Sequence, residues 1–184
     1  MTTITIKPAV SVKGEITVPG DKSISHRSIM LGAIANGTTT VRGFLRGGDN
    51  MATMGAFRAM GVDIADDGET VVIRGKGLHG LSEPTDVIDC GNSGTTLRLL
   101  AGALAGLPVR ATLAGDASLS RRPVARVVDP LRRMGARVSA RDGDRLPPLV
   151  IEGGGLTGIH HVSRVDLKYQ QECQKKHFHV RPLF

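Results

Sequence analysis

The segment Ala56-Phe-Arg-Ala-Met-Gly-Val-Asp-Ile64 recurs 74 residues later as Pro130-Leu-Arg-Arg-Met-Gly-Ala-Arg-Val138. Residues 71–77 and 149–155 match in the same way at an offset of 78. In both copies a helical apolar pattern ends at a Met-Gly pair, and a short strand pattern follows it. Repeats of this length are typical of chains built from similar units, each too small to bury its own apolar face, that stack on one another.

Around these matches the chain divides into two units of one design, residues 21–80 and 81–158, preceded by residues 1–20. In the first unit the patterns predict a helix entered through capping residues at 21–25 and ending near 34, a helix at 51–60, and strands at 38–42, 62–64 and 70–74. In the second unit they predict helices at 95–105 and 124–134, and strands at 87–89, 109–113, 137–138 and 149–151. Residues 4–6 and 11–18 alternate as opening strands. The order βαβαββ predicts an α+β fold.

Composition places the chain among globular proteins with aliphatic cores. It has 184 residues with no Trp, one Tyr and four Phe, so Val, Ile, Leu, Ala and Met must fill the core. No apolar run approaches the roughly 18 residues of a membrane span, and the N-terminus lacks a signal-peptide pattern. We therefore expect a cytoplasmic location and no membrane partner.

The two cysteines, Cys90 and Cys173, lie in neither a CxxC pair nor a His-rich metal spacing. This predicts no metal site and two reduced thiols. A thiol beside a helix start can have a lowered pKa, but we expect Cys90 to be a small buried residue at a strand end.

The charge is unevenly distributed along the chain. Of the net charge of +7, residues 159–184 carry +3, from five Lys or Arg against two Asp or Glu. The first 158 residues lack a basic run and aromatic residues that could stack on bases, so nucleic acid is not the expected partner. Residues 159–184 also hold every Gln, the single Tyr and four of the six His, but none of the 24 Gly. We expect a divergent, disordered tail of foreign origin there, with a metal-binding or RNA-binding tail as the alternative.

Two glycine-containing loops predict anion binding at helix starts. In Asp89-Cys-Gly-Asn-Ser-Gly-Thr-Thr-Leu-Arg98, glycines let a ligand approach the backbone, and unpaired amides at the helix start attract negative charge. In Pro19-Gly-Asp-Lys-Ser-Ile-Ser-His-Arg27, Lys22 supplies a point charge, Arg27 a planar fork and Ser23 a hydroxyl. Taken singly, each loop also fits an ordinary capped or solvated helix start.

A third loop, Gly115-Asp-Ala-Ser-Leu-Ser-Arg-Arg-Pro123, sets two arginines before a helix with Pro123 in its first turn. Three such loops at matching places in two repeats favour a substrate with more than one anionic group. Two further residues near the loops, Asp49 and His26, have roles that the sequence predicts less directly. Asp49 is expected first to cap the second helix, and alternatively to orient Lys22 or Arg122 by pairing. His26 is expected to be a solvated helix residue.

These three motifs resemble those of 5-enolpyruvylshikimate-3-phosphate synthase, the enolpyruvyl transferase of the shikimate pathway. The sister enzyme that acts on UDP-N-acetylglucosamine has a Lys-Asn pair where this chain has Lys22-Ser23. The resemblance covers residues 4–162 and implies an α/β prism made of six βαβαββ units in two globular halves. The chain would supply two of the six, forming most of one half, while residues 1–20 would belong to the opposite half.

The resemblance also implies a reaction that uses no metal or cofactor. The enolpyruvyl group of phosphoenolpyruvate passes to the 5-hydroxyl of shikimate 3-phosphate through a tetrahedral ketal phosphate, and phosphate is released. Lys22 would act in catalysis and touch both substrates, while Ser23 and Arg27 would hold shikimate 3-phosphate.

On the phosphoenolpyruvate side, the resemblance assigns Gly94 and Asn92 to face the substrate and Arg122 to bind its phosphate or carboxylate. The herbicide glyphosate competes at this site in the family. Gly94 would lie where a bulkier residue crowds glyphosate.

The residues that would move protons in the family lie outside the part that this chain resembles. General acid–base catalysis contributes about 10²–10⁴-fold, so we expect a truncated N-terminal piece with little independent turnover, which a complementing C-terminal half would rescue. The alternative is a non-catalytic basic module that binds phosphate or RNA through the same loops.

Overall fold

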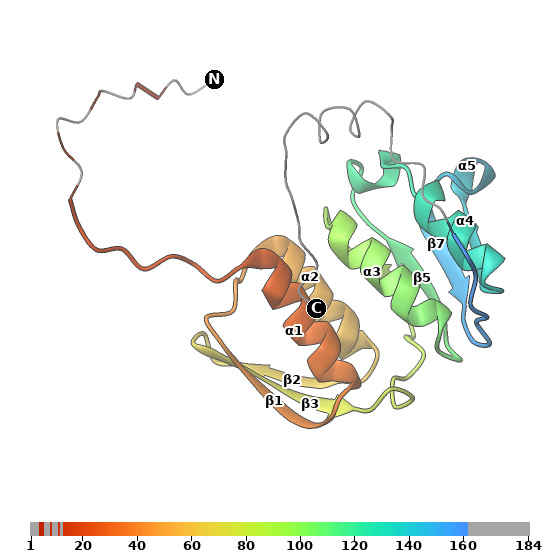
Figure 1. Ribbon diagram of the computed structural model, residues 1–184, viewed down its shortest axis with the longest axis horizontal. Coiled ribbons are helices and arrows are strands. Elements are labelled where there is room, and N and C mark those ends of the chain that lie inside the picture. Colours follow the sequence, from red (N-terminus) through yellow and green to blue (C-terminus); the bar gives the residue numbers. More distant parts are fainter. Residues whose placement is uncertain (1–3, 6–7, 9–10, 12, 162–184) are drawn as a thin grey trace, which may run out of the picture.

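The computed structural model describes residues 4–5, 8, 11 and 13–161, and two mixed units follow one another within them (Figure 1). The helices are α1 (Lys22–Ile34), α2 (Gly48–Ala59), α3 (Gly94–Ala105), α4 (Ala125–Arg133) and α5 (Arg141–Asp144), with a 3₁₀ turn, η1, at Leu119–Arg121. The strands are β1 (Asn36–Arg42), β2 (Asp63–Asp66), β3 (Thr70–Lys76), β4 (Ile88–Asp89), β5 (Arg110–Ala114), β6 (Arg137–Ala140) and β7 (Leu146–Glu152). The α+β prediction is confirmed, and η1 and α5 are the elements that the sequence patterns missed.

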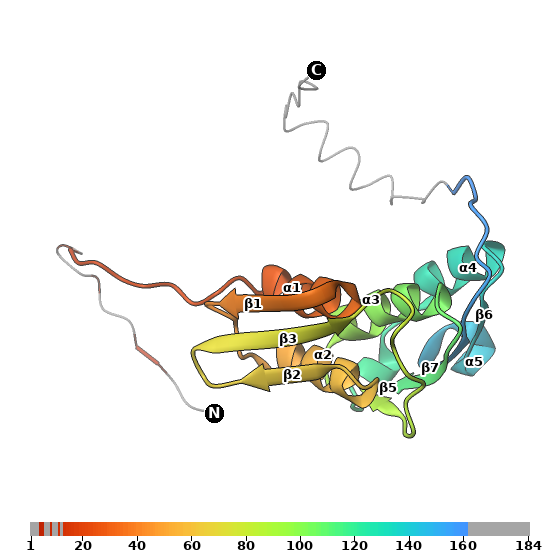
Figure 2. The same ribbon diagram turned by 90° about the horizontal axis from the view of Figure 1, so that it is seen from below.

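In the first unit, β3 lies between β1 and β2 and pairs antiparallel with both. Figure 2 shows this sheet in front of α1 and α2, which cover one of its faces. The apolar side of α1, represented by Ile29, and the side of α2 that carries Phe57 are buried together with Ile73 of β3. Burial of these aliphatic and aromatic side chains holds the helices on the sheet.

The second unit has the strand order β4-β5-β7-β6. β4 pairs parallel with β5, and the other two pairings are antiparallel. The order β5-β7-β6 therefore reproduces the order β1-β3-β2 of the first unit. β4 supplies a further strand that has no counterpart among the described residues of the first unit.

The sequence repeat is also a repeat of register. Ile64 faces Ile73 across the strand pair β2–β3, and the matched residues Val138 and Ile151 face each other across β6–β7. All four side chains are buried. Matched residues thus make the same cross-strand core contact in both units, although 9 positions separate the pair in the first unit and 13 in the second.

A buried seam between α2 and α3 joins the units, and both helices lie between the two sheets in Figure 1. Leu97, Leu100 and Leu104 of α3 are almost fully buried. The seam places the start of α3 beside the start of α2, so the predicted anion loops of the two units lie on one side of the molecule.

The predicted strand over 11–18 is wrong. Its described residues, 11 and 13–18, form neither strand nor helix, and Ile16 and Val18 are 84% and 72% exposed. An alternating pattern becomes a strand only where a partner strand accepts its hydrogen bonds, and no such partner occurs among residues 4–5, 8, 11 and 13–161. Residues 4 and 5 are likewise outside any strand, residue 6 lies outside the described residues, and so do residues 162–184 of the predicted tail.

Candidate anion-binding site

The first predicted loop forms the start of α1. Asp21 is the N-cap, and its carboxylate Oδ1 accepts a hydrogen bond of 2.7 Å from the amide of Ile24. Lys22, Ser23 and Arg27 follow on the first two turns and are exposed. The helix start therefore presents two cations and a hydroxyl to solvent, while the Asp21 carboxylate satisfies one of the free amides.

Lys22 is held by Asp49. The Nζ atom of Lys22 donates to Oδ2 of Asp49, and Asn50 Nδ2 donates to the Lys22 carbonyl oxygen at 2.9 Å. The expectation that Asp49 caps α2 is wrong, because α2 begins one residue earlier, at Gly48, and its N-cap Gly47 has no side chain to serve as a cap. The alternative, pairing with Lys22, is what the packing of α1 on α2 produces.

The second predicted loop leads into α3. Asp89 Oδ1 accepts from the Gly91 amide at 2.7 Å, and Gly91 has a φ of 54°, the left-handed region that favours glycine. Ser93 is the N-cap of α3, and its Oγ accepts from the Thr96 amide at 3.0 Å. Gly94 is thus the first helical residue, and Asn92 lies exposed just before it.

The third loop closes on the second. Arg122 Nη2 donates to Oδ1 of Asn92, and the Asn92 amide donates in turn to Asp116 Oδ2 at 2.7 Å. The hydrogen bond from Asn92, together with one from the Leu119 amide, lowers the pKa of Asp116, so this carboxylate stays charged near neutral pH. Arg122 follows η1 in extended backbone, and Pro123 lies before α4 rather than in its first turn, which corrects the predicted helix start.

Gly94 lies between two guanidinium groups. A Cβ built on Gly94 would be 2.7 Å from Nη1 of Arg98 and 3.3 Å from Nη1 of Arg122. Burial lowers the pKa of Arg98, and the nearby charges of Arg126 and Arg122 lower it further. This cluster of three arginines concentrates positive charge at the start of α3, which suits a bound anion.

Arg98 is a residue whose place in this cluster the sequence patterns did not identify. It lies one helical turn after Gly94, at the i+4 position, where its Nη1 donates to the Gly94 carbonyl at 3.5 Å. Helical spacing alone places it on the same face as Gly94. That spacing is the signal that would have found it.

His26 is not a solvated residue, contrary to the expectation. Its side chain is 1% exposed, and Nδ1 lies 2.7 Å from the hydroxyl oxygen of Thr53 on α2. Burial lowers the pKa of His26, with an opposing contribution from the nearby charge of Asp49 and a further lowering from Lys22. The imidazole is therefore neutral near neutral pH.

Of the predicted site residues, the structure joins Asn92, Gly94 and Arg122 into one cluster and pairs Lys22 with Asp49. Among the described residues, no hydrogen bond joins Ser23 or Arg27 to the second loop. These two residues are exposed on the first two turns of α1, the helix that also carries Lys22.

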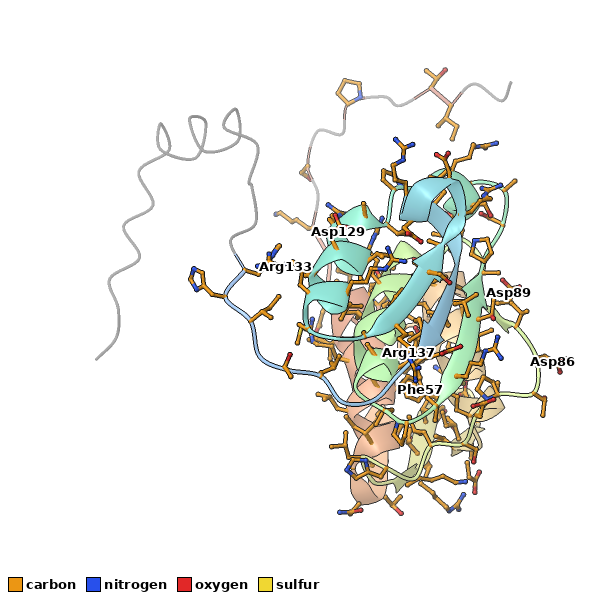
Figure 3. The ribbon with its side chains drawn as sticks, turned by 90° about the vertical axis from the view of Figure 1, so that its right-hand side faces the viewer. Phe57, Asp86, Asp89, Asp129, Arg133 and Arg137 are labelled. Atoms are coloured by element: carbon orange, nitrogen blue, oxygen red, sulfur yellow. The ribbon has the colours of Figure 1, made fainter. Side chains whose placement is uncertain are left out.

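A surface hollow lies away from the three predicted anion-binding loops. A hollow of about 460 Å³ lies on the outer face of the second sheet, lined by Arg132, Ala136, Arg137, Val138, Ser139, Val150 and Glu152. Figure 3 shows Arg137 on this face, where Nε of Arg137 pairs with Glu152 at 3.5 Å. None of the predicted anion-binding residues lines the hollow.

Three further observations concern the Cys90 thiol, metal-binding residues and membrane-spanning helices. Cys90 is fully buried, and burial with the nearby charge of Asp89 raises the pKa of its thiol to about 12, so the buried role is confirmed over the reactive one. In the part of the chain that the structure describes, no group of three or more His, Cys, Asp or Glu is arranged to hold a metal ion. Across the same residues, no helix has the length and apolar character needed to span a bilayer.

Comparison with known proteins gives consistent matches. The family model for EPSP synthase (3-phosphoshikimate 1-carboxyvinyltransferase) matches residues 6–168. The 3-phosphoshikimate 1-carboxyvinyltransferase of Geotalea uraniireducens (strain Rf4) is 66% identical over 165 residues, 90% of this chain and 39% of that protein. The corresponding protein of Geobacter sulfurreducens is 61% identical over 90% of this chain and 38% of its own length.

A solved structure of EPSP synthase from Acinetobacter baumannii superposes with a TM-score of 0.77 and 52% sequence identity. The superposition covers 79% of this chain and 33% of that one. The chain thus spans 38–39% of the length of these two curated relatives.

Proposed function

The chain belongs to the EPSP synthase family, and on that premise we propose that it forms one part of an enolpyruvyl transferase of the shikimate pathway. The proposed reaction transfers the enolpyruvyl group of phosphoenolpyruvate to the 5-hydroxyl of shikimate 3-phosphate. The hydroxyl loses its proton and its oxygen bonds to the enol carbon, while the double bond opens and the methylene carbon takes up a proton, which gives a tetrahedral ketal phosphate. The methyl group so formed then loses a proton, the double bond re-forms and phosphate leaves. Both substrates carry several negative charges, so binding and positioning require fixed cations.

The observation that carries this proposal is the cluster at the start of α3. Arg122 is fixed by its hydrogen bond to Asn92, and because Gly94 has no side chain, the guanidinium groups of Arg98 and Arg122 lie close against it. A planar guanidinium binds a phosphate or carboxylate through two parallel hydrogen bonds, and the amides of a helix start add further donors. We assign phosphoenolpyruvate to this cluster, with Asn92 and Gly94 facing it and Arg122 on its phosphate or carboxylate.

The start of α1 is the proposed shikimate 3-phosphate side. Ser23 and Arg27 are exposed there, and within the described part of the chain no side-chain hydrogen bond or ion pair of either residue would compete with a phosphate. Lys22 is the proposed catalytic residue that touches both substrates. Its pairing with Asp49 directs the ammonium group, so a substrate meets Lys22 in a defined position.

Glyphosate, on this proposal, competes for the phosphoenolpyruvate cluster. The rest of the catalytic site is supplied by the part of the family's enzymes that this chain does not span, acting as a complementing partner. The residues that move protons at the methylene of phosphoenolpyruvate and at the target hydroxyl belong to that part. We therefore expect this chain to bind substrates with little turnover.

Titration of the chain with phosphoenolpyruvate, followed by amide chemical shifts, tests the binding proposal. Arg122→Ala should weaken binding about tenfold or more, because a charge-assisted hydrogen-bond pair contributes about 1.5–3 kcal/mol. Arg121→Ala is the matched control, since Arg121 is an exposed arginine one residue away. Equal losses in both variants would show that only general positive charge matters, and would favour the non-catalytic basic module.

A turnover assay tests the remaining part of the proposal. Phosphate release from shikimate 3-phosphate plus phosphoenolpyruvate should be far slower with this chain than with the complete Geotalea uraniireducens relative. Addition of the remaining part of that relative should restore it. Turnover by this chain alone at the rate of the relative would refute the need for a complementing part.

A further inference from the structure

A buried chain of hydrogen bonds connects the two proposed substrate loops. His26 Nδ1 on α1 lies 2.7 Å from Thr53 Oγ1 on α2, and Thr53 Oγ1 lies 2.7 Å from Thr96 Oγ1 on α3. Thr96 Oγ1 is in turn 2.7 Å from the Oγ of Ser93, the N-cap of α3. These four side chains are at most 1% exposed, so no solvent competes for their hydrogen bonds.

The chain also reaches Lys22, through Asp49. The Thr96 hydroxyl donates to the backbone carbonyl oxygen of Asp49 at 3.2 Å, and the carboxylate of the same residue accepts from Lys22. Asp49 is therefore fixed at two points, by a buried hydroxyl on one side and by the lysine on the other. A change in the buried chain changes the position of the group that orients Lys22.

The direction of the chain follows from the unpartnered ring nitrogen of His26. Its Nε2 is buried and has no hydrogen-bond partner among the described residues, and a buried N–H left without an acceptor is costly, so the proton belongs on Nδ1. The Thr53 oxygen then accepts from Nδ1–H, and the single hydrogen of Thr53 goes to its nearer acceptor, Thr96 Oγ1 at 2.7 Å, and not to the Asp49 carbonyl oxygen at 3.5 Å. The Asp49 carbonyl oxygen and the Ser93 oxygen are both acceptors for the single hydrogen of Thr96.

We propose that His26, Thr53 and Thr96 are positioning residues, which fix Asp49 and through it Lys22 relative to the phosphoenolpyruvate loop by a one-way chain starting at Nδ1–H of His26. The functional part of this inference rests on the proposed function, since it names the groups that hold Lys22 in a fixed position relative to the loop at residues 91–94. The three residues lie behind the site and act through Asp49 and Ser93, without touching substrate. Because they come from three helices in two units, the chain sets the relative position of the two loops.

The first test needs no variant and no ligand. A long-range ¹H–¹⁵N spectrum of the histidine rings at pH 7.5 reports which nitrogen of His26 carries the proton. The Nδ1–H form is expected, although the Nε2–H form predominates for free neutral histidine. Observation of the Nε2–H form in the folded chain would overturn the proposal.

The second test uses variants that remove one hydroxyl with little change of shape. Thr53→Val should move His26 to the Nε2–H form, and Thr96→Val should shift the signals of Lys22 and Asp49. Thr96→Ser restores the hydroxyl and should restore the wild-type signals, while Thr38→Val, at an exposed position on β1, is the matched control. If Thr53→Val and Thr96→Val perturb these signals no more than Thr38→Val does, the chain does not position Asp49 and the proposal is wrong.

The third test measures function. Thr96→Val should bind phosphoenolpyruvate about threefold to tenfold more weakly than wild type, the effect of one buried hydrogen bond, and Thr96→Ser should bind like wild type. Equal affinity of Thr96→Val and wild type would overturn the positioning role. If the wild-type chain itself fails to bind phosphoenolpyruvate, the proposed function fails for this chain, and the two spectroscopic tests still decide whether His26 and Thr96 position Asp49.

Discussion

Gly75 lies so close to the end of α1 that a Cβ at this position would come within 2.3 Å of the carbonyl oxygen of Ala35. The matched residue of the second unit, Gly153, has the same relationship to α3, where a Cβ would lie 2.0 Å from the carbonyl oxygen of Leu104. In each unit a glycine on the central strand, or directly after it, allows the helix end to approach the sheet. The repeat therefore conserves a close contact of backbone with backbone.

We predict that Gly75→Ala and Gly153→Ala each destabilise the fold, by about 2 kcal/mol or more, because a backbone oxygen cannot move aside as a flexible side chain can. Gly102→Ala is the control. Gly102 is an exposed position of α3 where a Cβ meets nothing within 4 Å, and alanine there should stabilise the helix by about 0.5–1 kcal/mol. Urea denaturation of the three variants measures these differences. Equal stability of Gly75→Ala and Gly102→Ala would contradict the close approach.

The repeat shows how much of the fold the sequence could predict. The matched arginines Arg58 and Arg132 each donate to the carbonyl oxygen of the residue six positions later, Ile64 at 2.6 Å and Val138 at 2.6 Å. Local patterns of apolar residues and Met-Gly stops were enough to align these elements, because each helix and its following strand depend on nearby residues. The strand prediction failed at the described residues among 11–18 because a strand depends on a distant partner.

The site was only partly predictable for the same reason. Asp21 and Ser93 cap their helices as the local sequence indicates, since capping involves residues three positions apart. His26 on α1 and Asp49 on α2 were misjudged because these two helices pack on each other, and no local pattern records which helix covers another. Arg98 lies one helical turn after Gly94, which the sequence shows. Its position near Arg122 depends on a loop that is distant in sequence, which the sequence does not show.

The position of Gly94 gives a second prediction. In Gly94→Ala the new methyl group meets the ends of Arg98 and Arg122, which are flexible, so the fold should tolerate the change and the two guanidinium groups should move. We expect phosphoenolpyruvate and glyphosate each to bind about tenfold more weakly, since two charge-assisted contacts are disturbed. Titrations of this variant and of Gly102→Ala, in the same helix, check the expectation. Unchanged glyphosate affinity in Gly94→Ala would refute the role given to this glycine.

The buried thiol gives a third prediction. Because burial raises the pKa of Cys90 to about 12, almost none of it is thiolate at neutral pH, and a fully buried sulfur is also inaccessible. In a Cys173→Ser background, where Cys90 is the single cysteine, a maleimide reagent should label the native chain at least about a hundredfold more slowly than the chain unfolded in urea. Equal labelling rates in the native and unfolded states would show that the thiol is accessible.

The buried imidazole gives the fourth prediction, a pH dependence of stability. Burial lowers the folded-state pKa of His26 below its ordinary value of 6.5, so the unfolded chain takes up this proton at a higher pH than the folded chain does. The unfolded state then binds more protons, and the free energy of unfolding falls as the pH drops from about 6.5 toward the lowered pKa. The stabilising contribution of the neutral imidazole is complete above about pH 6.5.

The variant His26→Asn keeps a polar group for Thr53 but does not titrate, so its stability should change less steeply with pH in this window. His79→Asn, at an exposed position, should retain the wild-type slope. Chemical denaturation of the three proteins at intervals from pH 7.5 to 5 measures the slopes, and a His26→Asn slope as steep as wild type would show that another group is responsible.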